Sequence, residues 1–227
     1  MKKLIAIAAA LVLVGTQAFA QLSVGAGYLN STEITKRQTN DGVKKNSQDL
    51  NGFYAGANYT IGLDGLVEGL AVTPGAYASM LFGTNKDNTN VSYRDLSVNI
   101  PINISYGFNL TSDFKLMAFA GPIFQIGIIN KKITKTSNDT NITNNFEDKK
   151  AGATVDLGDL GVFGGEVTLV PARERFNILL GGGLGFEVNE QIAVLVGYNH
   201  SLMNYWKVDD KTSVARSQIT VGVNFKF

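Results

Sequence analysis

The amino-acid sequence predicts an all-β protein, an eight-stranded antiparallel up-and-down transmembrane β-barrel. In its C-terminal segment, residues 217–227, the apolar residues from Ile219 to Phe227 alternate with polar residues and glycine. This strand is apolar outward, polar inward and ends in an aromatic residue, as expected for the wall of a membrane barrel. Segments with the same period recur along the chain, and the links between them alternate between short and long.

The N-terminus has the pattern of a secretory signal peptide, and we expect residues 1–20 to be removed. Two early lysines precede an apolar core at residues 4–14, and Ala18-Phe19-Ala20 supplies the small-x-small pattern that precedes cleavage. The apolar core is too short for a confident transmembrane helix. The mature chain, residues 21–227, is then expected to be one outer-membrane barrel domain.

Eight segments with period two follow one another in the mature chain. They lie near residues 22–30, 50–62, 69–82, 93–108, 114–129, 176–187, 192–203 and 217–227. The fourth is the clearest, because apolar residues from Leu96 to Tyr106 alternate with small polar residues and Pro101. Proline has no amide hydrogen to donate, so we expect a bulge or a missing ladder bond at Pro101. An even number of strands suits a closed single-chain barrel.

The links between these segments predict which end of the barrel faces outward. Short turns are expected at residues 63–68, 109–113 and 188–191, and long external loops at about 31–49, 84–92, 132–175 and 204–214. Outer-membrane barrels place short turns toward the periplasm and long loops outside. A soluble β-sandwich would also alternate, but its strands are usually about 5–6 residues long, whereas barrel strands need about 9–11.

Composition argues against several classes of function. Of the 20 basic residues, the two leader lysines are lost on cleavage, which leaves 18 against 19 acidic residues and no basic excess for nucleic acid. The chain has no cysteine and one histidine, so it lacks the ligands for a zinc site. We therefore expect no cofactor, no metal and no catalytic residue.

The predicted inward positions are mostly small or polar. Five larger side chains lie among them: Tyr54, Tyr77, Lys115, Phe119 and Glu187. The interior of an eight-stranded barrel is just wide enough for side chains to fill. We expect packing rather than a wide pore, and we expect function to lie in the long loops.

Two groups of loop residues are candidates for binding. Asp156 and Asp159 lie in a glycine-rich stretch and would bind calcium or bridge it to lipid phosphate, but Ca²⁺ needs six or more oxygen ligands, so solvated carboxylates are the expectation. Lys131, Lys132 and Lys135 follow the fifth strand and are placed either to meet lipopolysaccharide phosphates or to remain solvated.

His200 is the only histidine, and alternation places it outward near the outer interface. A lipid hydrolase needs a histidine beside a serine and an orienting carboxylate. Ser201 points to the opposite face and this strand has no acidic residue, so we expect an interfacial side chain and no enzyme. Gly181–Gly185 lacks the lysine and helix of a phosphate loop, and its glycines suit a crowded barrel interior.

Four segments carry a family resemblance. They are residues 93–101 (YRDLSVNIP), 118–122 (AFAGP), 176–185 (FNILLGGGLG) and 196–204 (VGYNHSLMN). Together they resemble the outer-membrane β-barrel domain family that includes PorT-type proteins of the Bacteroidota. The resemblance implies a barrel in the outer membrane and makes Pro101 a family feature. The secretion role of the PorT-type branch is tied to no residue here.

The sequence therefore predicts an integral outer-membrane protein, non-enzymatic and monomeric, with a structural role or a binding role in its external loops. The expected partners are outer-membrane lipid and lipopolysaccharide, together with an external ligand or envelope protein, and not nucleic acid. The first alternative is a narrow channel for small polar solutes. The next is a lipid-acting enzyme or a secretion accessory protein.

Overall fold

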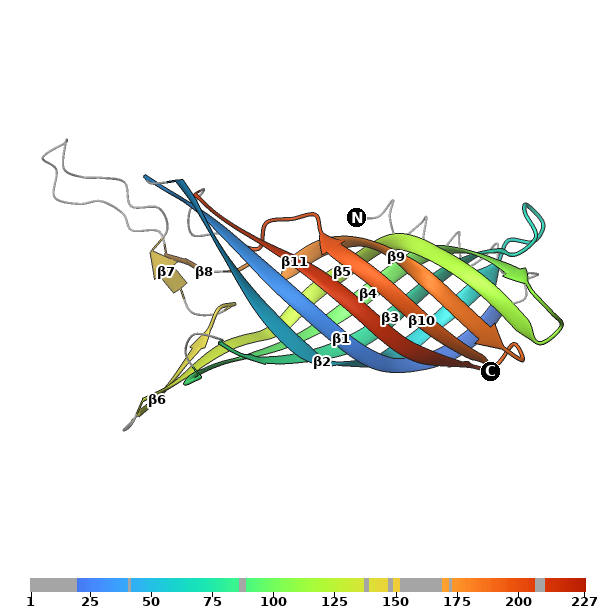
Figure 1. Ribbon diagram of the computed structural model, residues 1–227, viewed down its shortest axis with the longest axis horizontal. Coiled ribbons are helices and arrows are strands. Elements are labelled where there is room, and N and C mark those ends of the chain that lie inside the picture. Colours follow the sequence, from blue (N-terminus) through green and yellow to red (C-terminus); the bar gives the residue numbers. More distant parts are fainter. Residues whose placement is uncertain are drawn as a thin grey trace, which may run out of the picture.

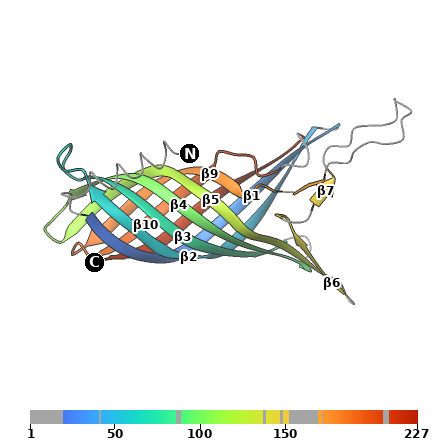
Figure 2. The same ribbon diagram turned by 180° about the vertical axis from the view of Figure 1, so that it is seen from behind.

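The computed structural model describes residues 20–40, 42–85, 89–136, 139–146, 149–151, 169–171, 173–206 and 211–227. Within these ranges, strongly tilted strands form a barrel that is elongated along its axis (Figures 1 and 2). Residues 1–19 of the expected signal peptide, and the candidate calcium ligands Asp156 and Asp159, lie outside the described residues. No helix within the described ranges is long and apolar enough to cross a bilayer.

Eight antiparallel strands close the barrel, as the sequence predicts. They are β1 (Ala20–Thr39), β2 (Gly42–Gly62), β3 (Leu70–Thr84), β4 (Val91–Asn109), β5 (Phe114–Thr136), β9 (Phe176–Val188), β10 (Ile192–Ser201) and β11 (Thr212–Lys226). Neighbours pair in the order β4-β3-β2-β1-β11-β10-β9-β5, and pairing of β4 with β5 completes the ring. Beyond the ring, β6 (Asp139–Asn144) pairs with β5, and β7 (Lys149–Ala151) pairs with β8 (Leu169–Pro171).

Side chains alternate between an apolar outer surface and a polar interior. Ile104 and Leu184 point outward and are 59 % and 62 % exposed, although both are large and apolar. Ser97 and Gln125 point inward and are buried. This inversion of the soluble pattern follows from the surrounding lipid, which accommodates apolar side chains while the closed ladder satisfies the backbone.

The first external hairpin is more ordered than the sequence predicts. Within the segment expected to be a loop, residues 31–49, the described residues 31–39 and 42–49 are strand, and β1 stays paired with β2 from Asn30 opposite Asn51 to Thr39 opposite Gly42. The loop prediction is wrong because the apolar alternation ends where the strands leave the lipid, whereas backbone pairing needs no apolar face and continues.

The other predicted loops are shortened for the same reason. β4 begins at Val91, within the predicted loop 84–92. β5 continues to Thr136, within the predicted loop 132–175, and β11 begins at Thr212, within the predicted loop 204–214. At the opposite end of the barrel, short turns join β2 to β3, β4 to β5 and β9 to β10, as predicted.

Pro101 interrupts the pairing on one side of β4. No ladder pair joins β3 to β4 between Ile102 and Asn99, which confirms the predicted gap and follows from the missing amide hydrogen of proline. The register shift of β4 lies elsewhere, between Leu96 and Ser97 on the side that faces β5.

Close strand contact makes Gly52 a sensitive position. A Cβ atom built there would lie 1.8 Å from the carbonyl oxygen of Met80 and 2.9 Å from the Cα of Leu81, both backbone atoms. We expect Gly52→Ala to lower the free energy of unfolding by about 1–3 kcal/mol, as overpacking does, measured by urea unfolding of the refolded barrel. Gly65→Ala is the matched control, because nothing lies within 4 Å of its Cβ; equal stability of the two variants would contradict the prediction.

Candidate functional site

A buried ionic network occupies the outer part of the lumen. Its centre is Arg216 on β11, which is 2 % exposed and lies directly opposite Glu33 of β1 in the ladder. The Nη2 of Arg216 donates to Glu33 Oε1 at 2.6 Å and to Asp95 Oδ2, on β4, at 2.9 Å. Arg173, just before β9, donates from Nη1 to the second oxygen of Glu33 at 2.7 Å. The network therefore connects β1, β4, β11 and the segment just before β9.

Amide and phenol groups extend this network across the lumen. The Nδ2 of Asn130 donates to Asp95 Oδ2 at 2.7 Å. Tyr205, in the link between β10 and β11, donates its hydroxyl hydrogen to Gln125 and accepts a hydrogen bond from Asn177 Nδ2 at 2.7 Å. The guanidinium of Arg216 lies over the Tyr205 ring, 5.1 Å from its centroid. We call Glu33, Asp95, Gln125, Asn130, Asn177, Arg173, Tyr205 and Arg216 the outer plug.

The ionic part of the outer plug lies beyond the lipid-facing band. The unbroken apolar run of outward residues ends before Glu33 and Arg216, at Tyr28 on β1 and at Ile219 on β11, where Asn30, Thr32 and Ser217 take over. Burial alone would raise the pKa of the Glu33 carboxyl, but the charges of Arg173 and Arg216 hold it at about 2. Burial raises the pKa of Tyr205 to about 12. The Glu33 carboxyl is therefore charged, and the Tyr205 phenol neutral, at every physiological pH.

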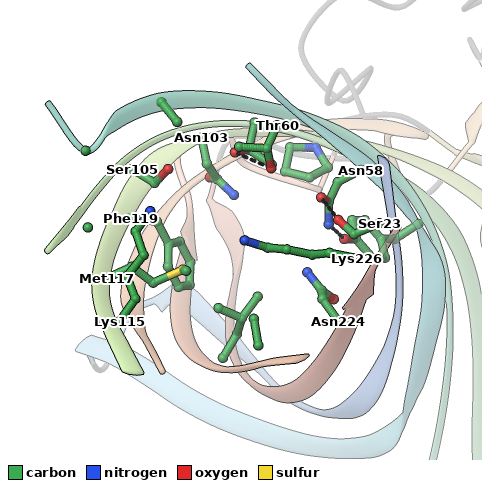
Figure 3. Close-up of a pocket in the computed structure, with 18 residues that line it drawn as sticks. Ser23, Asn58, Thr60, Asn103, Ser105, Lys115, Met117, Phe119, Asn224 and Lys226 are labelled. Atoms are coloured by element: carbon green, nitrogen blue, oxygen red, sulfur yellow. Dashed lines mark hydrogen bonds between the residues drawn. The ribbon is translucent and has the colours of Figure 1, made fainter. Parts of the chain in front are cut away.

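A cavity of about 120 Å³ lies in the inner half of the lumen (Figure 3). Lys226 reaches across it and forms an ion pair with the buried Glu187, while Lys115 and Phe119 line the wall. A second cavity of similar size adjoins it, and there Tyr54 and Tyr77 meet edge to face with ring centroids 5.7 Å apart. All five larger residues predicted to point inward do so.

The cavities of the lumen form an inner group and an outer one. The first inner cavity shares lining residues with the second, and it shares Lys115 and Lys226 with an opening at the mouth. A third cavity lies on the outer side, lined by Glu33, Asp95 and Arg173 of the outer plug. It has no lining residue in common with the two inner cavities.

The glycine run of β9 makes room for these side chains. A Cβ at Gly181 would lie 1.8 Å from Asn199 Oδ1, and a Cβ at Gly183 would lie 2.7 Å from the Phe119 ring. The predicted role of Gly181–Gly185 in a crowded interior is confirmed.

The outer end of the β1–β2 hairpin carries two opposed pairs of basic residues. Lys36 faces Lys45 and Arg37 faces Lys44 across the ladder, and all four are exposed. The hairpin projects beyond the ring (Figure 1). Among the described residues, none gives these four side chains an ion pair or a hydrogen bond. Like charges directly opposite one another destabilise a sheet, so this basic hairpin is not explained by folding.

Lys131, Lys132 and Lys135 lie on the outer part of β5 and not in a loop. Lys131 stands opposite Arg94 of β4, another like-charged pair. The backbone amide of Lys135 donates to the carbonyl of Asn90 at 2.9 Å, which holds this segment against the start of β4.

His200 is exposed on the outer surface, as predicted, and its partner is Ser217 of the next strand. The Nδ1 of His200 lies 2.9 Å from Ser217 Oγ, and the Tyr198 hydroxyl donates to the same oxygen at 3.2 Å. Ser201 faces inward and donates to Asn177 Oδ1 at 3.1 Å. Within the described ranges no carboxylate bonds to His200, so the histidine and serine lack the orienting group of a hydrolase.

The sequence did not predict the outer plug, because three of its eight residues fall in predicted loops. Glu33 falls within the segment 31–49, and Tyr205 and Arg173 fall in two other links. The available signal was charge at inward positions, since Asp95 and Arg216 alternate in phase with buried neighbours. The described part of the chain holds no cluster of three or more histidine or acidic side chains that would suit a metal.

The match of this chain to a protein-family model agrees with this architecture. The family model "Outer membrane protein beta-barrel domain" matches residues 6–227. The attachment invasion locus protein Ail of Yersinia pestis is 12 % identical, with a TM-score of 0.45 over 92 % of this chain and 99 % of that chain. OprG from Pseudomonas aeruginosa is also 12 % identical, with a TM-score of 0.44 over 92 % and 97 %. The outer membrane protease OmpT from Escherichia coli is 9 % identical, with a TM-score of 0.38 over 92 % and 96 %.

These likenesses are low and fall on proteins with different tasks, one of them a protease. They assign no activity to this chain. No curated protein has a significantly similar sequence.

Proposed function

We propose that this chain, which belongs to the outer membrane protein beta-barrel domain family and is an integral outer-membrane barrel, does not let solutes through its lumen. Its barrel anchors the basic hairpin in the membrane, and the hairpin binds anionic polymers outside the cell. The chain carries no catalytic group in this proposal and works as a monomer. The single observation that supports it most is the basic hairpin, which holds four exposed cations on paired strands without a counter-charge among the described residues.

A rigid display of cations favours a polymer over a small ion. Lys36 and Lys45 lie on one face of the hairpin, and Arg37 and Lys44 lie on the other. Because the backbone ladder already orders both strands, binding requires little further loss of backbone entropy. Charges on two faces suit a chain that carries repeated sulfate, phosphate or carboxylate groups and wraps around the hairpin.

The outer plug supports the anchor role over the channel alternative. A passing solute would have to displace Arg216 from Glu33 and Asp95, and breaking a buried ion pair is unfavourable by several kcal/mol. The observation that favours a narrow channel is the inner cavity, which is lined in part by Ser23, Asn58 and Asn103 and shares residues with the opening at the mouth. Among the described residues, the His200–Ser217 contact is the one observation that favours a lipid-acting enzyme, and none favours the secretion accessory role.

The test uses mature protein refolded in detergent. Dextran sulfate is the anionic probe, and neutral dextran is the uncharged control. We expect salt-sensitive binding of dextran sulfate alone. Changing all four basic residues of the hairpin to glutamine should weaken it at least about tenfold, or about 1.4 kcal/mol. The matched control changes Arg94, Lys131 and Lys135 to glutamine, which also removes basic charge near the outer rim.

Equal loss in the two variants would mean that binding reflects overall charge and would contradict the proposal. The same preparation in a planar bilayer should give no discrete conductance. Reproducible single-channel steps would favour the channel instead.

A further inference from the structure

The opposed pair Arg94 and Lys131 lies on the lipid-facing side of the wall. Arg94 on β4 and Lys131 on β5 are direct ladder partners. The next residue of β4, Asp95, is buried in the lumen, so alternation turns Arg94 outward, and Arg94 is exposed. Lys135 follows four residues later on the same face of β5. The wall therefore presents a short row of cations to the outside.

The depth of this pair is set by its neighbours. The next outward pair toward the membrane is Leu96 opposite Ile129, which begins the apolar band. On its other side Arg94 is the ladder partner of Phe82, which contacts the Phe53 ring at a centroid distance of 6.4 Å. Aromatic rings mark the level of lipid headgroups in membrane proteins. Arg94 and Lys131 thus stand where acyl chains give way to headgroups.

No described acidic side chain offsets these two charges. The nearest carboxylate in sequence, Asp95, points inward and is bound to Arg216 and Asn130. Within the described ranges neither Arg94 nor Lys131 has an ion pair or side-chain hydrogen bond. Their opposition destabilises the sheet, and an anion between them would convert this repulsion into attraction.

We propose that Arg94 and Lys131 together bind a phosphate group on the headgroup of an outer-leaflet glycolipid. Guanidinium binds phosphate through two parallel hydrogen bonds, and the ammonium group adds a compact charge from the facing strand. Phe82 and Leu96 lie beside the pair and suit the sugar and the acyl chains. The assignment of this site rests on the outer-membrane location of the barrel, and it does not require that the basic hairpin binds a polymer.

The test is native mass spectrometry of the refolded mature protein with bisphosphorylated lipid A, with its enzymatically dephosphorylated form and with inorganic phosphate. We expect preferential binding of the phosphorylated lipid. Arg94→Gln combined with Lys131→Gln should weaken it at least about tenfold. Lys36→Gln combined with Lys45→Gln is the matched control, since it removes an opposed basic pair near the tip of the β1–β2 hairpin, on other strands than Arg94 and Lys131, and should leave lipid binding unchanged.

Three results would overturn the assignment. They are equal binding of the dephosphorylated lipid, equal loss in both double variants, and binding of inorganic phosphate as strong as binding of the lipid. Heat-modifiable gel mobility confirms that each variant is folded. Arg94→Lys keeps the charge but removes the planar fork, and partial retention of binding is expected. Unchanged dextran sulfate binding by the Arg94/Lys131 variant would separate this site from the basic hairpin.

Discussion

Replacing Arg216 by methionine should lower the free energy of unfolding by about 3–5 kcal/mol, because a buried ion pair loses one partner. Glu33 and Asp95 would remain in the lumen without the guanidinium that binds both. Methionine fills much of the space but offers no hydrogen bond. Urea unfolding in phospholipid vesicles, followed by the mobility of unboiled protein on gels, measures the change.

Two further variants give this prediction its controls. Lys45→Met removes an exposed basic residue of the hairpin and should change stability by less than about 0.5 kcal/mol. Combining Arg216→Met with Glu33→Gln and Asp95→Asn should recover part of the loss, since no uncompensated charge then remains. An Arg216→Met protein as stable as the wild type would show that the outer plug contributes little.

Acid should weaken the barrel through Glu33. Its pKa lies at about 2 in the folded protein against an ordinary value of 4.5, held down by Arg173 and Arg216 in spite of burial. A carboxyl with a lowered pKa stabilises the folded state above its unfolded pKa and loses that contribution as the pH falls toward the folded value. We therefore expect a loss of about 3 kcal/mol between about pH 5 and pH 2.

Glu33→Gln isolates this contribution from that of other carboxyl groups. The variant should be less stable than the wild type near neutral pH, because Arg216 and Arg173 lose their shared acceptor. The difference between the two proteins should shrink as the pH falls, since protonation makes the wild-type side chain similar to glutamine. A constant difference across this range would assign the acid sensitivity to other groups.

The sequence was sufficient to predict the barrel itself. Alternation from Leu96 to Tyr106 and from Ile219 to Phe227 identifies strands that face lipid, and short links distinguish the two ends. It was insufficient for the outer hairpin, because residues 31–49 are polar on both faces. Their strand structure is imposed by pairing of β1 with β2 and not by an apolar face.

The candidate sites depend on register between strands that are distant in sequence. Alternation predicts that His200 and Ser201 point to opposite faces, but it does not predict that Ser217 on the next strand is the partner of His200. Glu33 and Arg216 are 183 positions apart. A one-residue change of register reverses which side chains meet, so local pattern cannot supply these contacts. Inward charge is the general signal that would have directed attention to the outer plug.

The ion pair between Glu33 and Arg216 also lies at the seam where the first strand meets the last. β1 and β11 cannot pair until every strand between them has been delivered, so closure joins the first and last strands of the barrel. If the seam closed one residue out of step, Arg216 would turn toward the outside and leave Glu33 in the lumen without a cation. Only the aligned seam buries both charges together. The ion pair between Glu33 and Arg216 therefore favours the correct register of β1 and β11 when the barrel closes.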